Sequence, residues 1–296
     1  MRNTVLYGDC RQTLQQIAQS GDKARMCVTS PPYYGLRDYG KEDDQIGLEE
    51  SPEEFIDQLV EVFRGVRDCL TDDGTLWVNI GDSYYNYRGG KGQALPKQSV
   101  ATTNQDLPQG KNPRRGNKLK GYKEKDLIGI PWMLAFALRK DGWYLRQDII
   151  WSKPNPMPES VRDRCTKSHE YIFLLSKSQN YYFDVNSIKV PTVDGNQLKR
   201  RKSVWEVKTK PYKGAHFAVY PSELIIPTIL AGSEEGDIIL DPFMGSGTTA
   251  AVAKSLKRDY LGCELHDDYD ALIHKRVSEV SETVTVDKST LLDLLK

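Results

Sequence analysis

The chain has 296 residues, of which 39% are hydrophobic and 28% are charged, and its formal net charge is zero. This composition is typical of a folded globular protein and excludes wholesale disorder, and the length suits one α/β core with insertions. No run approaches the ~18 apolar residues of a transmembrane helix, and the amino terminus lacks a signal-peptide pattern, so we expect a cytoplasmic location.

The first third of the chain alternates strand and helix signals. The strongest helix signal begins at Ser51, which can cap a helix together with Glu54, while Pro52 suits the first turn. Strand-helix alternation of this kind predicts a parallel sheet with helices on its faces. We predict strands at residues 4–7, 26–29 and 75–80 and helices at 10–19 and 51–70.

The pattern breaks between residues 84 and 122, where Gly, Asn, Gln, Pro, Lys and Arg replace almost all aliphatic residues. A compact domain rarely carries so long a loop without a use for it. Beyond this break, we predict helices at 127–140 and 222–231, after Thr248 and from Asp267, and strands at 144–151, 171–175, 237–240 and 260–263.

The zero net charge hides an uneven distribution. Residues 86–125 hold ten Lys or Arg against two acids, and residues 184–213 hold eight against three, whereas residues 214–296 hold seven against fourteen. Two basic segments on an otherwise acidic chain indicate contact with a polyanion. On charge alone, a pair of solvated loops explains them equally well.

The five cysteines are scattered and contain no C-x-x-C pair, which argues against a disulfide framework or a zinc ribbon. Cys263 and His266 have the spacing of half a metal site, but the sequence offers no second pair to complete it. We therefore expect reduced thiols and no metal.

The first motif with chemical content is the turn Ser30-Pro31-Pro32-Tyr33, which follows an apolar strand directly. Two prolines stiffen the backbone, so the turn can present fixed carbonyl acceptors beside a flat aromatic ring. An exocyclic amino group of a nucleobase needs such acceptors for its hydrogens and a ring to stack on. The alternative is an ordinary strand-ending turn in which Tyr33 only packs.

The second motif is the segment 238–249, a buried strand followed by a Gly-containing turn and a helix start that Thr248 or Thr249 would cap. Glycines let a ligand approach the backbone, and a helix amino terminus offers N–H groups to a carboxylate. Glu264 ends the next strand, where a carboxylate can accept hydrogen bonds from ribose hydroxyls. This pattern predicts a nucleoside site, and the missing Walker-type Lys argues against ATP or GTP.

The order of these motifs resembles the amino-group DNA methyltransferases of the beta arrangement, whose catalytic turn precedes the cofactor turn. The resemblance covers nearly the whole chain and includes residues 7–10, 150–156, 169–172 and 216–221. It implies an α/β fold with a Rossmann-like methyltransferase sheet, a circularly permuted motif order, and S-adenosyl-L-methionine as cofactor. Together with the motifs, it assigns catalysis to Ser30, Pro31, Pro32 and Tyr33, and cofactor binding to Asp9, Cys10, Phe217, Pro221, Asp241, Phe243, Gly245, Gly247, Thr248 and Glu264.

The first residue of the turn is a serine rather than Asp or Asn, and in this respect the chain resembles the cytosine-N4 branch of this family. The expected activity is methyl transfer to N4 of a cytosine extruded from duplex DNA, because a stacked base cannot reach a buried methyl donor. We expect the rings of Tyr33 and Tyr34 to hold that extruded base. Adenine-N6 methylation is the alternative enzyme activity. A catalytically silent DNA-binding protein of the same fold is the alternative from another class.

We expect a catalytic domain composed of residues 1–85, 126–183 and 214–282, with the two basic segments 86–125 and 184–213 inserted for DNA contact and target recognition. Double-stranded DNA is the expected partner, and a cognate restriction nuclease and a second copy of the chain are further candidates. The residues expected to contact DNA are Arg114, Arg115, Lys118, Lys120, Arg200, Arg201 and Lys202.

Overall fold

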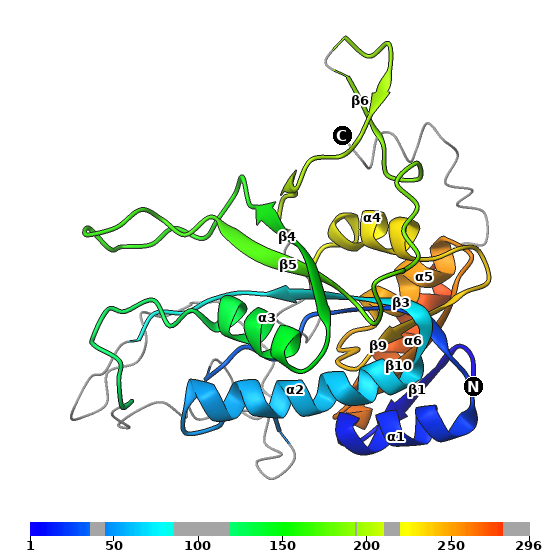
Figure 1. Cartoon of the computed structure of the whole chain (residues 1–296), viewed down its shortest axis with the longest axis horizontal. Helices are drawn as coiled ribbons and strands as arrows, with labels where there is room; N and C mark the ends of the chain where they lie inside the picture. The colour runs from blue at the N-terminus through cyan, green and yellow to red at the C-terminus, as the bar shows by residue number, and fades with distance from the viewer. Residues whose placement is uncertain (36–44, 86–118, 193, 210–219, 281–296) are drawn as a thin grey trace.

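A computed structural model describes residues 1–35, 45–85, 119–192, 194–209 and 220–280. An eight-stranded sheet lies between two layers of helices (Figure 1). The first hydrophobic cluster packs α1, α2 and α3 on one face, and the second packs α4, α5 and α6 on the other. The helices are α1 (Cys10–Ser20), α2 (Pro52–Cys69), α3 (Ile130–Lys140), α4 (Ser222–Gly232), α5 (Thr248–Ser255), the 3₁₀ turn η1 (Asp267–Tyr269) and α6 (Asp270–Ser278).

The strand order of the sheet is β1-β10-β9-β2-β3-β5-β4-β8. Neighbouring strands from β1 to β3 are parallel, and β5 runs antiparallel to both β3 and β4. The strands of this sheet are β1 (Thr4–Tyr7), β2 (Ala24–Thr29), β3 (Leu70–Ile80), β4 (Tyr144–Ser152), β5 (His169–Ser176), β8 (Val204–Glu206), β9 (Ile238–Asp241) and β10 (Asp259–Glu264). A separate two-stranded ribbon pairs β6 (Val190–Pro191) with β7 (Leu198–Lys199).

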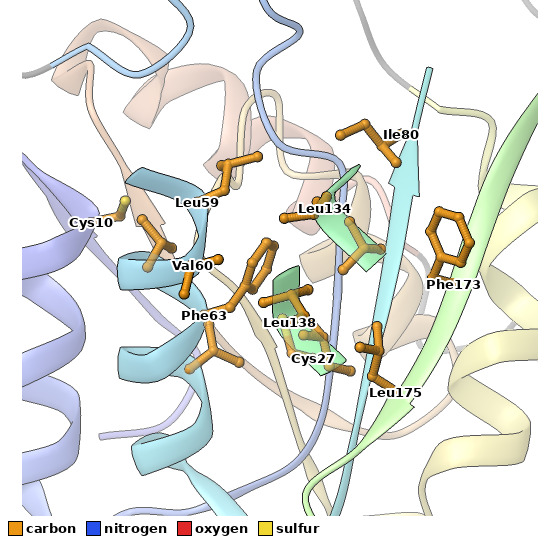
Figure 2. Packing of buried hydrophobic residues seen from close by; sticks show 14 of the residues in the cluster. Cys10, Cys27, Leu59, Val60, Phe63, Ile80, Leu134, Leu138, Phe173 and Leu175 are labelled. Atoms are coloured by element: carbon orange, nitrogen blue, oxygen red, sulfur yellow. The ribbon is translucent and has the colours of Figure 1, made fainter. Parts of the chain in front are cut away.

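Helix α2 forms where its capping signal predicts. The Ser51 hydroxyl accepts the Glu54 N–H at 3.2 Å, and the Glu54 carboxylate accepts the Ser51 N–H at 3.3 Å, so the two residues satisfy each other's backbone. Leu59 and Phe63 point from this helix toward the sheet and pack with residues of β2, β3, β5 and α3 (Figure 2). Burial of this apolar face holds the layer in place.

One predicted helix start and one predicted helix cap are wrong in detail, for physical reasons. Helix α3 begins at Ile130 rather than Leu127, because the Asp82 carboxylate accepts the N–H groups of Gly129 and Ile130 at 3.0 and 3.2 Å. Helix α5 is preceded by Gly247, whose φ of 81° places it in the left-handed region, and neither threonine caps it through its side chain.

Part of the second basic segment joins the main sheet. Strand β8 pairs with β4 in parallel, and Trp205 in its centre is only 3% exposed. The Trp205 indole N–H donates to the Lys202 carbonyl at 2.8 Å, so this aromatic anchor fixes the short strand and the residues before it. Within the described part of the chain, no helix is both long and apolar enough to cross a membrane.

The topology brings the motifs to one place. Strands β1, β10, β9, β2, β3 and β4 end at the same edge of the sheet, and the antiparallel β5 begins there. We call this the carboxyl edge. Ligands of open α/β sheets bind at such an edge, so the site should be sought there.

Candidate active site

The turn after β2 lies at the carboxyl edge and is held by its tyrosine. The Tyr33 hydroxyl donates to the Glu170 carboxylate at 2.7 Å, and the Asn79 side-chain amide donates to the same oxygen at 3.2 Å. Lys153 forms an ion pair with the other oxygen of Glu170. Ser30 is half-buried, and its side chain forms a hydrogen bond with the Tyr33 hydroxyl.

The Tyr33 phenol is nevertheless held in its neutral form. Burial and then the charge of Glu170 raise its pKa well above the ordinary value, and these effects outweigh the hydrogen bonds from Ser30 and from the Gly81 backbone. Tyr33 is therefore a hydrogen-bond donor and a flat surface in this site, and it is not a base.

The next residue has a different role from the one we expected. A pair of stacking rings at Tyr33 and Tyr34 is an attractive interpretation of the sequence, but Tyr34 is only 4% exposed. Its ring packs against Phe55 of α2, with the ring centroids 5.4 Å apart, and its hydroxyl donates to the Glu50 carbonyl. Tyr34 is a core residue, so of these two rings only that of Tyr33, which is half-buried, is left to offer a face to a ligand.

Asp241, at the end of β9, ties the two motifs together. It is 1% exposed and accepts hydrogen bonds from Thr29 at 2.6 Å and from the Phe243 N–H at 3.0 Å. The hydroxyls of Tyr220 and Thr249 donate to its other oxygen. Burial raises the pKa of this carboxyl, and the four donors oppose that shift. Asp241 thus anchors β2 to the turn that follows β9.

Glu264, at the end of β10, has a simpler environment. Its carboxylate accepts the Gly245 N–H at 2.7 Å and the His266 N–H at 3.1 Å, and the residue is 8% exposed. Burial raises its pKa to about 7 despite these bonds. A carboxylate has room for about four hydrogen bonds, so Glu264 retains acceptor capacity for a hydroxyl-bearing ligand.

The turn between Asp241 and α5 is fixed by a residue of α6. The Arg276 guanidinium donates to the Ser246 hydroxyl at 2.6 Å and to the Thr248 hydroxyl at 2.7 Å. A Cβ atom at Gly247 would lie 3.1 Å from Ile273, so a side chain there would crowd α6. The predicted positions Gly245, Gly247 and Thr248 therefore lie in one braced turn, with half-buried Phe243 beside it.

The remaining predicted cofactor residues that the structure describes lie at or near the same edge. The Asp9 carboxylate caps α1 through the Arg11 N–H at 2.9 Å and forms an ion pair with the Arg11 side chain at 2.7 Å. Cys10 is buried, and Pro221 is buried directly before α4. Phe217 lies outside the described residues.

The comparisons with known proteins decide the family. A DNA methylase family model matches residues 24–275. The chain belongs to this DNA methylase family. It is 46% identical to the Type II methyltransferase M.Cfr9I of Citrobacter freundii over 96% of this chain and 90% of that protein. It is 49% identical to the Type II methyltransferase M.SmaI of Serratia marcescens, over 92% and 90%.

Solved methyltransferase structures share the fold. The cytosine-N4-specific PvuII DNA methyltransferase matches with a TM-score of 0.64 at 16% identity, covering 100% of this chain and 92% of that one. The M1.HpyAVI-SAM complex matches with a TM-score of 0.56 at 19% identity, covering 92% and 98%. The predicted fold class and the predicted family are thus confirmed.

The residues predicted to contact DNA in this methylase fall into three groups. Lys120, Arg200 and Lys202 are exposed. Arg201 is half-buried and stacks over the Trp205 ring at 4.9 Å, and burial lowers its pKa. Arg114, Arg115 and Lys118 lie outside the described residues.

A cavity of about 320 Å³ lies between β4 and the segment before β8. Arg146, Arg200, Arg201 and Lys202 line it together with aromatic rings such as Tyr181 and Phe183. Among the described residues that line the cavity, none is acidic. This surface suits an anion with a planar group attached, which is the character of a nucleotide.

Sequence reasoning gave several residues of the site no individual role, although the resemblance implies that segments 150–156 and 169–172 flank the target-base pocket and that segment 216–221 closes over the methionine end of the cofactor. Glu170, Lys153 and Asn79 hold Tyr33, and Tyr220 holds Asp241. The signal for Glu170 is a charged residue at the start of an otherwise apolar strand. That signal marks a residue worth examining, but only the antiparallel pairing of β5 with β3 shows that it meets the turn after β2.

Proposed function

We propose that this DNA methylase transfers a methyl group from S-adenosylmethionine to N4 of a cytosine extruded from double-stranded DNA. The observation that carries the proposal is the position of the turn opened by Ser30. It follows β2, which pairs directly with β9, and β9 leads into the Gly-containing turn. Motifs separated by about two hundred residues in the sequence are therefore neighbours at the carboxyl edge.

The residues at this edge fit the cofactor. Glu264 has spare acceptor capacity at the end of β10, where the two ribose hydroxyls would donate to it. The braced turn at Gly245 and Gly247 leads into α5, whose amino-terminal N–H groups suit the carboxylate of the methionine part. Asp9 and Cys10 would border the adenine, with Phe243 near the base or the sulfur and Pro221 near the methionine part. When bound, the cofactor supplies a methyl group activated by a sulfonium.

The chain's own task is to orient an amino group and to stabilise the positive charge that develops on its nitrogen. The Ser30 hydroxyl and the Pro31 carbonyl are suitable acceptors for the two amino hydrogens. Pro32 keeps the turn stiff, and Tyr33 offers the ring against which the base would stack. Because Tyr33 stays protonated, the site works by alignment rather than by a strong base.

We assign the contacts with DNA to the basic segments 86–125 and 184–213, and the chemistry to the framework of residues 1–85, 126–183 and 214–282. The exposed side chains of Lys120, Arg200 and Lys202 would contact backbone phosphates, as would Arg201 beside them. Because the similar proteins are Type II methyltransferases, we infer a role in restriction and modification, with a cognate nuclease as the companion activity.

The test is to express the chain in a host that lacks DNA methylation, to digest the DNA to nucleosides and to sequence the modified positions. N4-methylcytosine at one short recognition sequence is the expected product. N6-methyladenine as the main product would replace the base assignment and keep the site. If a folded chain that binds DNA produced no methylated base, the proposal of an enzyme would be wrong.

A further inference from the structure

The turn opened by Ser30 is attached to the neighbouring strands of the sheet by the side chain of Tyr33. Tyr33 reaches from the end of β2 to Glu170 on β5, at 2.7 Å. Asn79 of β3 and Lys153 after β4 bind the same carboxylate. Three neighbouring strands thus contribute to one acceptor for the Tyr33 hydroxyl, and that acceptor is largely shielded from solvent, with 12% of its side chain exposed.

The space around the ring is equally restricted. A Cβ atom at Gly81 would lie 2.9 Å from the Cε2 atom of Tyr33 and 3.4 Å from the carboxyl carbon of Glu170. Only a glycine therefore leaves room for the tyrosine ring at this position. On the other side of the turn, the backbone oxygen of Tyr33 lies 3.3 Å from the place of a Cβ atom at Gly47. The ring and its backbone are confined from both sides.

We propose that Glu170, oriented by Lys153, is a positioning residue for methyl transfer: it fixes the Tyr33 ring, and through it the Ser30 turn, before the base arrives. The proposal rests on the function proposed above and adds a role for residues outside the catalytic turn. The negative charge of Glu170 also supports this positioning role. The negative end of the Glu170–Lys153 pair faces the turn, where positive charge develops on the amino nitrogen during transfer.

A second reason favours positioning over a purely structural role. A buried ion pair adds little net stability compared with apolar residues of similar size, because both charges lose their hydration. This pair lies at the carboxyl edge and is linked directly to the catalytic turn. Its value lies in holding one geometry, and a rate measurement detects that role, whereas a loss of stability would follow from removing either partner of the pair in any case.

The experiment is a double-mutant cycle on the full-length chain, with single-turnover methylation of a DNA duplex as the readout. We expect Tyr33→Phe and Glu170→Ala each to lower the rate about 10- to 100-fold, with cofactor affinity changed less than about twofold. Because both remove the same hydrogen bond, the double variant should be no slower than Glu170→Ala alone. Glu170→Gln keeps an oxygen acceptor for Tyr33 and should recover most of the rate.

The matched control is Asp141→Asn, which removes another shielded carboxylate, 10% exposed, that pairs with Arg64 and Arg67 away from the carboxyl edge. It should lower thermal stability and leave the rate unchanged. Independent, multiplying effects of Tyr33→Phe and Glu170→Ala would overturn the proposal, as would full rates in both.

If Glu170→Ala does not fold, the near-isosteric Tyr33→Phe and Glu170→Gln variants carry the test. Gly81→Ala should slow transfer as well, because the added methyl group displaces the ring. A wild-type chain that methylates no DNA would instead show that the proposed function has failed.

Discussion

The two halves of the carboxyl edge use their carboxylates differently. In the half formed by β1, β10 and β9, the groups of the described chain that hold Glu264 are backbone N–H groups, and its pKa is raised to about 7. In the half formed by β2, β3, β5 and β4, Glu170 is paired with Lys153 and accepts two further side-chain donors. Both carboxylates are shielded from solvent, yet only the second has a cationic partner.

This difference shows how one edge can serve two purposes. A buried carboxylate without a cation is costly to ionise, and hydrogen bonds from an incoming ligand lower that cost. Glu264 therefore gains from a ligand with hydroxyl groups. Glu170 is already satisfied, so it can hold its surroundings still whether or not a ligand is present. We interpret the first half as a binding surface and the second as a fixed frame for the target base.

The largest effect should come from the target half. Ser30→Ala removes one acceptor of the amino group and leaves the Pro31 carbonyl, so we expect a rate loss of about 10- to 1,000-fold, as for an interaction made chiefly in the transition state. Cofactor affinity should stay nearly unchanged, because Glu264 and the Gly-containing turn are untouched. Single-turnover kinetics and calorimetry measure the two quantities. A loss of cofactor affinity as large as the loss of rate would contradict the assignment of binding and of target positioning to separate halves of the edge.

A change in the binding half should give a smaller effect, and that effect should be on cofactor affinity instead of on the rate of transfer. Glu264→Ala removes the carboxylate that would accept the ribose hydroxyls and should weaken S-adenosylmethionine binding by roughly 1–3 kcal/mol. Calorimetry on the folded variant checks this. Unchanged affinity would remove Glu264 from the site.

The raised pKa of Glu264 gives binding a pH dependence. Its folded pKa of about 7 lies above the ordinary 4.5, so this group lowers the stability of the ligand-free chain as pH rises between these values. Ribose hydroxyls donate to the ionised form, so cofactor affinity should rise about tenfold from pH 6 to pH 8, with release of a proton on binding below pH 7. Calorimetry in two buffers of different ionisation enthalpy detects that proton. The Glu264→Gln variant should show neither the rise nor the release.

The smallest effect concerns DNA contact outside the edge. Replacing Arg200 and Lys202 together with Gln should weaken DNA binding and reduce the dependence of log K on log salt by about one to two, because fewer counterions are released. The Lys189→Gln and Lys208→Gln pair of the same segment, of which Lys189 is half-buried and Lys208 exposed, tests whether charge alone matters. If both double variants flattened the salt dependence equally, the contact would be diffuse and not centred on the cavity at Arg201.

Local signals predicted much of this fold. The capping pair at Ser51 and Glu54 and the apolar spacing of α2 are properties of contiguous residues, so the sequence predicts that helix almost to the residue. The turns after β2 and β9 were also recognisable, because each joins an apolar strand to residues with special backbone preferences. That parallel strands end together then followed from topology alone.

The contacts that hold the site were not predictable in the same way. The start of α3 depends on Asp82, some fifty residues earlier in the chain, and the role of Tyr33 depends on Glu170, which lies 137 positions away. Because Tyr34 is aromatic and follows Tyr33, the sequence predicts that it also stacks on the target base. The backbone instead turns its ring toward Phe55. Such pairings become visible only once strand order and register are known.

The measurement that tests the account most directly is a single-turnover titration with S-adenosylmethionine on a DNA duplex, because it yields a limiting rate and a half-saturating cofactor concentration for each variant. The account predicts that Ser30→Ala lowers the limiting rate and leaves the half-saturating concentration unchanged. Glu264→Ala should raise the half-saturating concentration and leave the limiting rate within a few-fold of the wild-type value. If both variants changed the same parameter, the separation of the carboxyl edge into a binding half and a target half would be contradicted.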